Sequence, residues 1–392
     1  MPEYRPVPER YRQQLQRFDE YAFHIEDGPQ THDPDDLDAL LGDQRGIFDG
    51  EDLLSVGTLV EFDARFRGSW ITLGGLRGVS TPPEHRRQGY VRQFARESLA
   101  EFRDRGVPLV ALWPFETSFY RNLGWGTCQK YVRYDFPPRA LAAVGERGEG
   151  TYRQVGEANW ETVRDAHLAA GEGNTLALRL TDDWWRRRFD GRSPYCYAYE
   201  RDGDVVGYVL YTVESDGDEY EMRVWDLSAA DADAERALFW LVATHDSQVQ
   251  TVRHYRTESA LLDRVADPSE FECRLGMGPM VRIPDVPSAL EAVPTPERAG
   301  EVTVGVTDDL SPWNDGQFGV RTDGETVSCE PVSADTAPDA TVDVTTLSQL
   351  VVGYHDVERA ERVGSLAVSD DATRDALDAL FPPQRVALRE FF

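Results

Sequence analysis

Val79-Ser80-Thr81-Pro82-Pro83-Glu84-His85-Arg86-Arg87-Gln88-Gly89-Tyr90 is the stretch that decides the fold. It predicts a strand that ends at Pro82–Pro83, because proline cannot donate a ladder hydrogen bond. A turn follows and opens a helix, whose first backbone N–H groups have no partners within the helix. Two arginines and a glycine stand beside these groups. The turn is therefore predicted to cradle a pyrophosphate.

The residues on both sides of this turn complete one structural unit. A hairpin turning at Arg67–Gly68 is predicted before it. After it, apolar residues from Val91 to Phe102 recur at helical spacing, and Gly106 closes that helix. The apolar run Leu109–Trp113 is typical of a strand buried on both faces, and a segment that carries Tyr120 follows. This order of elements predicts an enzyme that uses coenzyme A.

Length and composition indicate a soluble globular protein of two or three domains. The chain has 392 residues, of which 41% are hydrophobic and 11% aromatic. No apolar run is as long as a membrane span, and the first residues lack the apolar core of a signal peptide. We expect a cytoplasmic protein, with an acidic loop at Thr31–Asp38.

The formal charge of −29 excludes a nucleic-acid-binding protein, which needs a basic face. Lys130 is the single lysine, and the other basic residues are arginines. The acidity either attracts cationic substrates or adapts the whole surface to high salt, as in halophilic archaea. Because the acidic residues are dispersed, we expect the second. The four cysteines and seven histidines are unclustered, so neither a disulfide framework nor a metal site is predicted.

Beyond Pro137–Pro138 the order of elements repeats. A hairpin at Tyr195–Glu214, a strand at Glu221–Leu227 and a helix at Ala234–Thr244 are predicted, without a basic turn before the helix. This indicates a degenerate repeat that has lost the phosphate site. After Pro279–Pro294, short strands alternate with helices, which predicts an α+β domain. Because the chain closes on Phe391–Phe392, we expect its end to be buried.

These residues resemble the GNAT superfamily of N-acetyltransferases and, within it, the enhanced intracellular survival (Eis) family. The GNAT motif is Arg/Gln-x-x-Gly-x-Gly/Ala, and Arg86-Arg87-Gln88-Gly89-Tyr90-Val91 departs from it at the last position. The wider string from Val79 to Gly89 resembles the Eis version closely. Tyr120-x-x-Leu123-Gly124-Trp125-Gly126 is similar to the family's Tyr-x-x-Phe-Gly-Tyr-Gly block.

The resemblance covers essentially the whole chain and implies an α/β (α+β) architecture. The implied domains are an active GNAT domain at 1–137, a degenerate GNAT-like domain at 138–284 and a sterol-carrier-like domain at 285–392. Eis relatives assemble as hexamers, so the resemblance also implies a homo-oligomer. It implies acetyl-CoA as co-substrate and no metal.

The resemblance assigns coenzyme-binding roles to six residues: Val79, Thr81, Arg86, Arg87, Gln88 and Gly89. The backbone of the first two would pair with the pantetheine arm, and the other four would surround the pyrophosphate. From the residues alone, the arginines are either this cradle or surface charges at a helix start. Their place before Gly89 and an apolar helical stripe favours the cradle.

Two catalytic roles are implied. Tyr120 aligns with the family's general acid, and the terminal carboxylate of Phe392 aligns with its general base. A phenol held near the coenzyme sulfur can protonate a departing thiolate. The alternative for Tyr120 is a core aromatic residue with a satisfied hydroxyl, and for Phe392 a solvated tail.

We therefore predict acetyl transfer to a primary amine by direct attack in a ternary complex. The acceptor would be a small molecule, such as an aminoglycoside-like compound or a polyamine, or a lysine side chain. The alternative is a non-catalytic protein that binds a lipid or small molecule in its sterol-carrier-like domain. Retention of Arg86–Gly89 and Tyr120 favours the enzyme.

Overall fold

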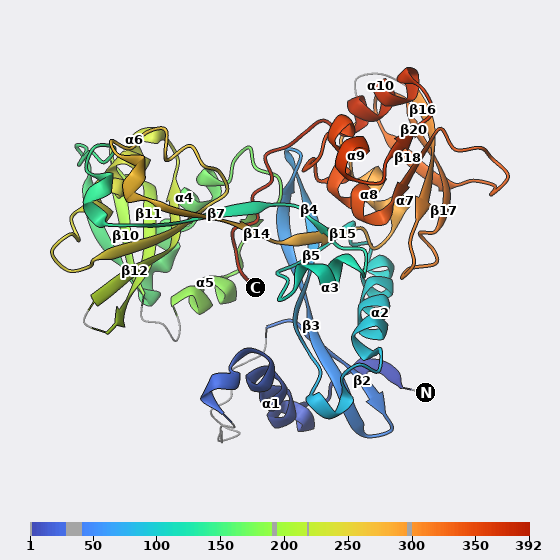
Figure 1. Cartoon of the computed structure of the whole chain (residues 1–392), viewed down its shortest axis with the longest axis horizontal. Helices are drawn as coiled ribbons and strands as arrows, with labels where there is room; N and C mark the ends of the chain where they lie inside the picture. The colour runs from blue at the N-terminus through green and yellow to red at the C-terminus, as the bar shows by residue number, and fades with distance from the viewer. Residues whose placement is uncertain (1, 29–40, 190–193, 218, 296–299) are drawn as a thin grey trace. The chain divides into compact units, whose positions relative to one another are not determined.

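The computed structural model describes residues 2–28, 41–189, 194–217, 219–295 and 300–392 (Figure 1). Contacts divide the chain into two units: Met1–Cys128 with Pro279–Phe392, and Gln129–Gly278. The acidic loop expected at Thr31–Asp38 lies outside the described residues. In the part of the chain that is described, no helix is long and apolar enough to cross a membrane.

The first unit is built on a mixed sheet in which β4 and β5 run parallel. In spatial order its strands are β1 (Glu3–Pro6), β2 (Asp43–Asp49), β3 (Asp52–Phe66), β4 (Ser69–Ser80), β5 (Leu109–Leu112), β15 (Met280–Arg282) and β6 (Gly126–Thr127). β3 and β4 form the predicted hairpin. Its turn residues Arg67 and Gly68 both have positive φ, which matches the right-handed twist of paired strands.

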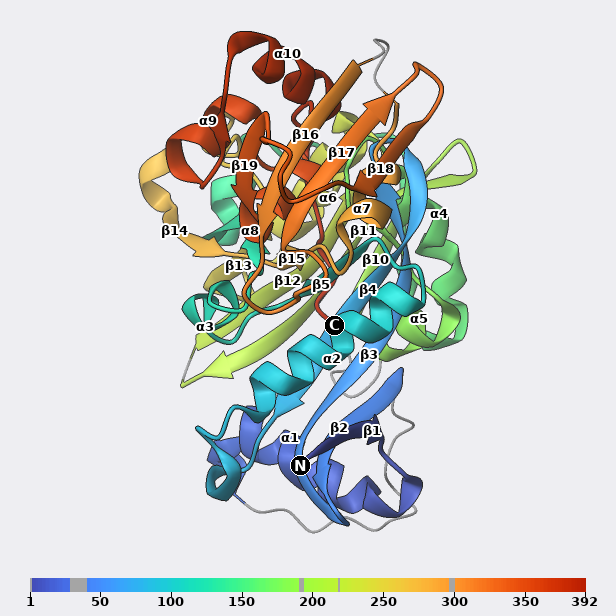
Figure 2. The same cartoon turned by 90° about the vertical axis from the view of Figure 1, so that its right-hand side faces the viewer.

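Helices cover this sheet, and the predicted apolar stripe is the buried one. Helices of this part are α1 (Arg12–Phe23), α2 (Tyr90–Asp104), α3 (Thr117–Arg121) and the short 3₁₀ turns η1 (Glu9–Tyr11), η2 (Ile25–Asp27) and η4 (Pro83–His85). Figure 2 shows α2 running along β3 and β4. Phe94, Leu99 and Phe102 of α2 are fully buried and join a core with Leu59 and Leu76.

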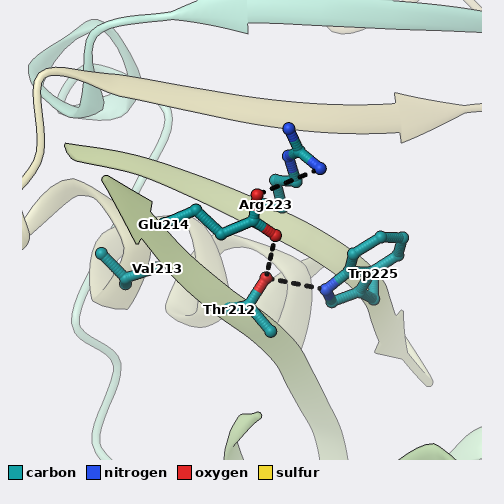
Figure 3. A pocket seen from close by; sticks show the side chains of 5 residues that line it. All are labelled: Thr212, Val213, Glu214, Arg223 and Trp225. Atoms are coloured by element: carbon teal, nitrogen blue, oxygen red, sulfur yellow. Dashed lines mark hydrogen bonds and ion pairs between the residues drawn. The ribbon is translucent and has the colours of Figure 1, made fainter. Parts of the chain in front are cut away.

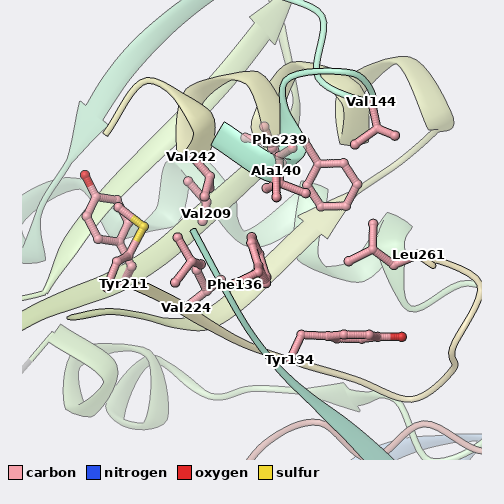
Figure 4. Packing of buried hydrophobic residues seen from close by; sticks show 14 of the residues in the cluster. Tyr134, Phe136, Ala140, Val144, Val209, Tyr211, Val224, Phe239, Val242 and Leu261 are labelled. Atoms are coloured by element: carbon pink, nitrogen blue, oxygen red, sulfur yellow. The ribbon is translucent and has the colours of Figure 1, made fainter. Parts of the chain in front are cut away.

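The second unit repeats this arrangement around its own sheet. In spatial order its strands are β14 (Glu272–Met277), β7 (Lys130–Phe136), β13 (Thr251–Arg256), β12 (Glu219–Ala229), β11 (Asp204–Asp216), β10 (Tyr195–Arg201) and β8 (Thr151–Val155). The unit also contains β9 (Leu178–Arg179), α4 (Arg164–Ala170), α5 (Asp182–Phe189), α6 (Ala232–Ala243), η5 (Pro138–Leu141), η6 (Glu157–Val163) and η7 (Pro268–Glu270). Tyr134 and Phe136 of β7 pack in one core with Phe239 of α6 (Figure 4).

The chain passes from one sheet to the other at two connections. β6 ends at Thr127, yet β7 begins at Lys130 in the other sheet. β14 ends at Met277, and β15 then enters the first sheet between β5 and β6. The first sheet is therefore completed by β15, which follows the whole second unit in the sequence, whereas the seven strands described for the second sheet all lie within Gln129–Gly278. The domain borders expected at residues 137 and 284 stay a proposal.

The C-terminal part of the first unit is the predicted α+β domain. Its sheet has the order β18 (Val327–Pro331), β17 (Gly316–Thr322), β16 (Gly300–Thr307), β19 (Ala340–Asp343) and β20 (Ala367–Val368). Its helices are α7 (Val286–Glu291), α8 (Val344–Val351), α9 (Val357–Val363) and α10 (Asp371–Leu380). The chain then returns as an extended segment in which Val386–Leu388 and Phe392 are buried.

A buried ion pair joins this domain to the first sheet. Arg282 of β15 is fully buried, and its Nη2 donates to both carboxylate oxygens of Asp308 at 2.7 Å. Asp308 Oδ1 also accepts from the backbone N–H groups of Leu310 and Ser311 at 3.0 Å. Burial lowers the pKa of Arg282, and the Asp308 carboxylate opposes that shift.

We expect Asp308→Ala to destabilise the first unit by about 3–5 kcal/mol, because it leaves the Arg282 charge buried and uncompensated. Urea unfolding followed by tryptophan fluorescence measures the change. The matched control is Glu301→Ala, which breaks the exposed Arg321–Glu301 pair and should leave the unfolding midpoint unchanged. A midpoint for Asp308→Ala equal to that of the control would contradict the expectation.

Candidate active site

β4 and β5 separate partway along their length. Their parallel pairing covers Leu73–Gly75 opposite Leu109–Ala111, but β4 continues to Ser80. On the side of β5, none of the described residues pairs with residues 76–80. Backbone groups along this part of β4 are thus available to an extended ligand, which could add as a strand does.

A bulge shapes the free part of β4. Two of its residues, Gly78 and Val79, stand opposite the single residue Gly57 of β3, and Gly78 has φ 60°. A bulge of this kind bends the strand and redirects its backbone groups. Val79 is half-buried within the free part, and Thr81 follows the last residue of β4.

The start of α2 is open to an anion. Its N-cap is Gly89, with φ 84° and no side-chain capping bond. The first backbone bond of the helix runs from Gln93 N to Gly89 O, and among the described residues nothing accepts from the N–H groups of residues 90–92. A Cβ at Gly89 would meet no atom within 4 Å, so a ligand can approach the backbone closely.

Two side chains of the turn bond to nearby backbone carbonyl groups, and a third is exposed to solvent. Arg86 Nε donates to Thr81 O at 3.0 Å, and its guanidinium lies 5.0 Å from the ring centre of Tyr21. Gln88 donates through Nε2 to Glu84 O at 3.2 Å. Both side chains therefore brace the turn. Arg87 is exposed, with φ 60°, so its charge is available beside the helix start.

The corresponding helix of the second unit is closed to anions. The N-cap of α6 is Asp231, whose Oδ1 accepts from Ala234 N at 2.8 Å. Asp231 is also paired with Arg201, and Asp233 and Glu235 lie in the first turn. A carboxylate thus occupies the position that a phosphate would take, and it repels other anions. The loss of the phosphate site in the second unit stays a prediction, and the closed start of α6 agrees with it.

Tyr120 lies on the short helix α3, where it is almost fully buried at 4% exposure. Its ring contacts those of Phe115, Phe119 and Trp125 edge to face, at centroid distances of 5.6, 5.3 and 6.1 Å. Burial raises the pKa of Tyr120 to about 12. The phenol therefore keeps its proton throughout the neutral range and can donate it.

The ring of Phe392 packs at the point where the pairing of β4 with β5 ends. It lies 4.8 Å from that of Phe62 on β3, and it covers Gly75, the last residue of β4 that pairs with β5. Trp113, which follows β5, donates from Nε1 to Glu390 O at 2.8 Å. Neither Gly75 nor Trp113 was predicted as a site residue, although a Gly-Gly pair inside a strand signals a close approach of another group. Within the described residues, no hydrogen bond or ring contact joins Tyr120 to Phe392.

We expect Gly75→Ala to destabilise the first unit by about 1–3 kcal/mol, because the core there is already full. A Cβ at residue 75 would lie 2.8 Å from Phe392 Cε2 and 2.5 Å from Val60 Cγ2. Urea unfolding measures the effect. Gly316→Ala is the control, since a Cβ there meets nothing within 4 Å. Equal midpoints for the two variants would show that Phe392 does not pack against Gly75.

A separate open cavity of about 340 Å³ lies on the sheet of the second unit (Figure 3). It is lined by Thr212, Val213, Glu214, Arg223 and Trp225. Its polar groups bond to one another: Trp225 Nε1 donates to Thr212 Oγ1 at 3.0 Å, and Arg223 pairs with Glu214 at 3.2 Å. None of the residues predicted for the active site lines it. In the described parts of the chain, no cluster of three or more His, Cys, Asp or Glu side chains could hold a metal ion.

Comparison with known families agrees with this geometry. Residues 3–128, which contain the open turn and Tyr120, match the family model of the acetyltransferase (GNAT) domain. Residues 176–283 match a second acetyltransferase (GNAT) model. The chain is a tandem GNAT N-acetyltransferase. In this acetyltransferase, residues 286–389 match the sterol carrier protein domain.

The acetyltransferase is similar to several other N-acetyltransferases in sequence or fold. An N-acetyltransferase of Streptomyces avermitilis is 29% identical over 72% of this chain and 73% of its own length. One from Streptomyces griseus is 27% identical, with 80% of both chains covered. The structure of a probable N-acyltransferase from Enterococcus faecalis covers all of both chains with a TM-score of 0.88 at 20% identity. Eis1 of Mycobacterium abscessus has a TM-score of 0.78 at 21% identity, which shows that it shares the fold.

Proposed function

We propose that the first domain of this acetyltransferase moves the acetyl group of acetyl-CoA to a primary amine by direct attack in a ternary complex. The observation that carries the proposal is the open N-terminus of α2 beside the free part of β4. The helix start supplies unpartnered N–H groups and a positive dipole end, and Arg87 adds a full charge. These features suit a pyrophosphate, with the pantetheine arm along Val79 and Thr81.

We assign the role of the acid to Tyr120 and the role of the base to the carboxyl group of Phe392. Tyr120 keeps its proton because burial raises its pKa to about 12, so it would protonate the departing thiolate. The carboxyl group of Phe392 would receive the amine proton. An α-carboxylate has an intrinsic pKa of about 3.5, so it would work through a bridging water or by holding the ammonium group.

Direct attack is supported by the state of the cysteines. Cys128, Cys196 and Cys329 are buried, and burial raises the pKa of each thiol; for Cys196 and Cys329 it reaches about 12. Because the thiolate is the nucleophilic form, these residues are poor acyl carriers. Cys273 is exposed but lies on β14 of the second unit.

For the acceptor we propose an amine on a small molecule, such as an aminoglycoside-like compound or a polyamine, or a lysine side chain. We also propose that the chain is an acidic member of the Eis family and forms a homo-oligomer, such as the hexamer of Eis relatives. The layout of two GNAT domains and a sterol carrier protein domain supports that membership. The alternative is a non-catalytic protein that binds a lipid or small molecule in its sterol-carrier-like domain; the open start of α2 and the buried Tyr120 favour the enzyme.

Two-substrate kinetics test the proposal. Wild-type protein is incubated with acetyl-CoA and a panel of primary amines, and thiol release is followed. Initial rates at several concentrations of both substrates should give intersecting double-reciprocal lines, as a ternary complex requires. Parallel lines would indicate an acyl-enzyme instead. If folded protein fails to bind acetyl-CoA in calorimetry, the proposal is wrong.

A further inference from the structure

Trp113 holds the segment that leads to Phe392. Its indole Nε1 donates a hydrogen bond to Glu390 O at 2.8 Å. Its ring lies 5.5 Å from the ring of Phe391, with an interplanar angle of 49°. One side chain therefore contacts both residues that precede Phe392. Phe391 is itself 79% exposed, so its contact with Trp113 is not part of the buried core.

The rest of this segment is anchored separately. Arg67, at the tip of the β3–β4 hairpin, donates from Nη1 to Pro382 O at 2.9 Å. The same guanidinium bonds the carbonyl groups of Leu350 and Val351 at the end of α8, at 3.0 and 2.9 Å. Val386–Leu388 are buried. These contacts fix the beginning and middle of the segment. Trp113 and the packing of the Phe392 ring against Phe62 contribute to holding its last residues.

Trp113 also belongs to the connection that carries the proposed acid. It comes directly after Leu112, the last residue of β5, and the same connection leads into α3 with Tyr120. Phe392 covers Gly75 at the point where β4 leaves β5. A contact from Trp113 to residues 390 and 391 therefore ties the position of Phe392 to the chain segment that positions Tyr120.

We propose that Trp113 is a positioning residue, which places the carboxyl group of Phe392 by holding Glu390 and Phe391. This inference rests on the proposed function, in which that carboxyl group receives the proton of the amine. Trp113 does not touch a reacting atom. Its effect comes through the chain segment that it holds, and a displacement of about 1 Å in a reacting group can cost on the order of 100-fold in rate.

The test is Trp113→Phe, which keeps an aromatic ring beside Phe391 and removes the N–H donor. We expect kcat to fall about 10- to 100-fold, with KM for acetyl-CoA unchanged. The matched control is Trp313→Phe. Trp313 is also half-buried and also donates to a backbone carbonyl at 2.8 Å, that of Pro284. The control should keep the wild-type kcat. A wild-type kcat for Trp113→Phe would overturn the inference.

A double variant separates positioning from general support of the fold. If Trp113 acts through Phe392, deleting Phe392 in the Trp113→Phe background should lower kcat no further than the deletion alone. Additive losses would overturn the inference, because Trp113 would then act elsewhere.

A second measurement needs no activity. Carboxypeptidase A is added to folded protein, and release of Phe392 is followed by mass spectrometry. We expect release to be several-fold faster from Trp113→Phe than from Trp313→Phe, and equal rates would overturn the inference. If deletion of Phe392 leaves kcat unchanged, that result contradicts the role of Phe392 as the base in the proposed function.

Discussion

Tyr120→Phe is expected to lower kcat by about 10²- to 10⁴-fold, the usual contribution of a general acid, and to leave acetyl-CoA binding unchanged. The variant removes one hydroxyl and keeps the ring that packs against Phe115, Phe119 and Trp125. The fold should therefore survive, so the loss reports on the proton. Thiol release from acetyl-CoA with a verified amine measures kcat, and calorimetry measures binding.

The control for this variant is Tyr134→Phe. Tyr134 is fully buried in the core of the second unit, and burial raises its pKa to about 12 as well. It differs from Tyr120 in lying on β7, a strand of the second unit's sheet. Its variant should keep the wild-type kcat. Equal kcat values for the two variants would remove Tyr120 from the mechanism.

The pH dependence gives an independent check of the same role. Because the folded-state pKa of Tyr120 lies near 12, above the ordinary value of about 10, the protonated form is lost only as the pH rises through 12. Wild-type kcat should show no fall attributable to this phenol below about pH 11. A fall centred near pH 10 would indicate an exposed phenol.

Arg87→Glu is expected to weaken acetyl-CoA binding by about 100-fold or more. A charge-assisted hydrogen bond contributes about 1.5–3 kcal/mol, and the new carboxylate adds repulsion of the phosphates. Arg87 is exposed beside the open start of α2, so the substitution should not disturb the core. Calorimetry at moderate ionic strength measures the affinity, because high salt would screen the effect.

Arg96→Glu is the matched control. Arg96 lies on the same helix, is exposed and pairs with Glu97 at the surface, so the net charge changes equally. It lies away from the helix start, and its variant should bind acetyl-CoA as the wild type does. If both variants lose affinity equally, overall charge rather than a local cradle governs binding.

Local features could be predicted correctly from the sequence where a residue type or a hydrophobic spacing is compatible with only one local structure. The Arg67–Gly68 turn, the apolar stripe of α2 and the all-apolar β5 are confirmed, because period and turn chemistry act over short distances. The tandem GNAT domains and the sterol carrier protein domain are confirmed by the family matches. The residue roles within the site stay predictions.

What could not be predicted are contacts between residues far apart in the chain. Nothing in the spacing of the sequence indicates that Arg67 binds the end of α8, or that Trp113 meets Glu390. Nor does the pattern of Lys130–Phe136 show that it joins the second sheet. Its alternating apolar residues suit either sheet, and the choice depends on tertiary pairing.

The position of β15 in the sequence, after the whole second unit, has a consequence for biosynthesis. When the ribosome has made the first 128 residues, β5 has no β15 beside it, and β6 has no strand to bridge it to β5. The missing strand emerges only after the entire second unit has been translated. During that whole interval the backbone groups on one edge of β5 have no strand to pair with. Such an unpaired edge favours chaperone binding or aggregation. The part of the enzyme that is translated first is thus among the last to complete its fold.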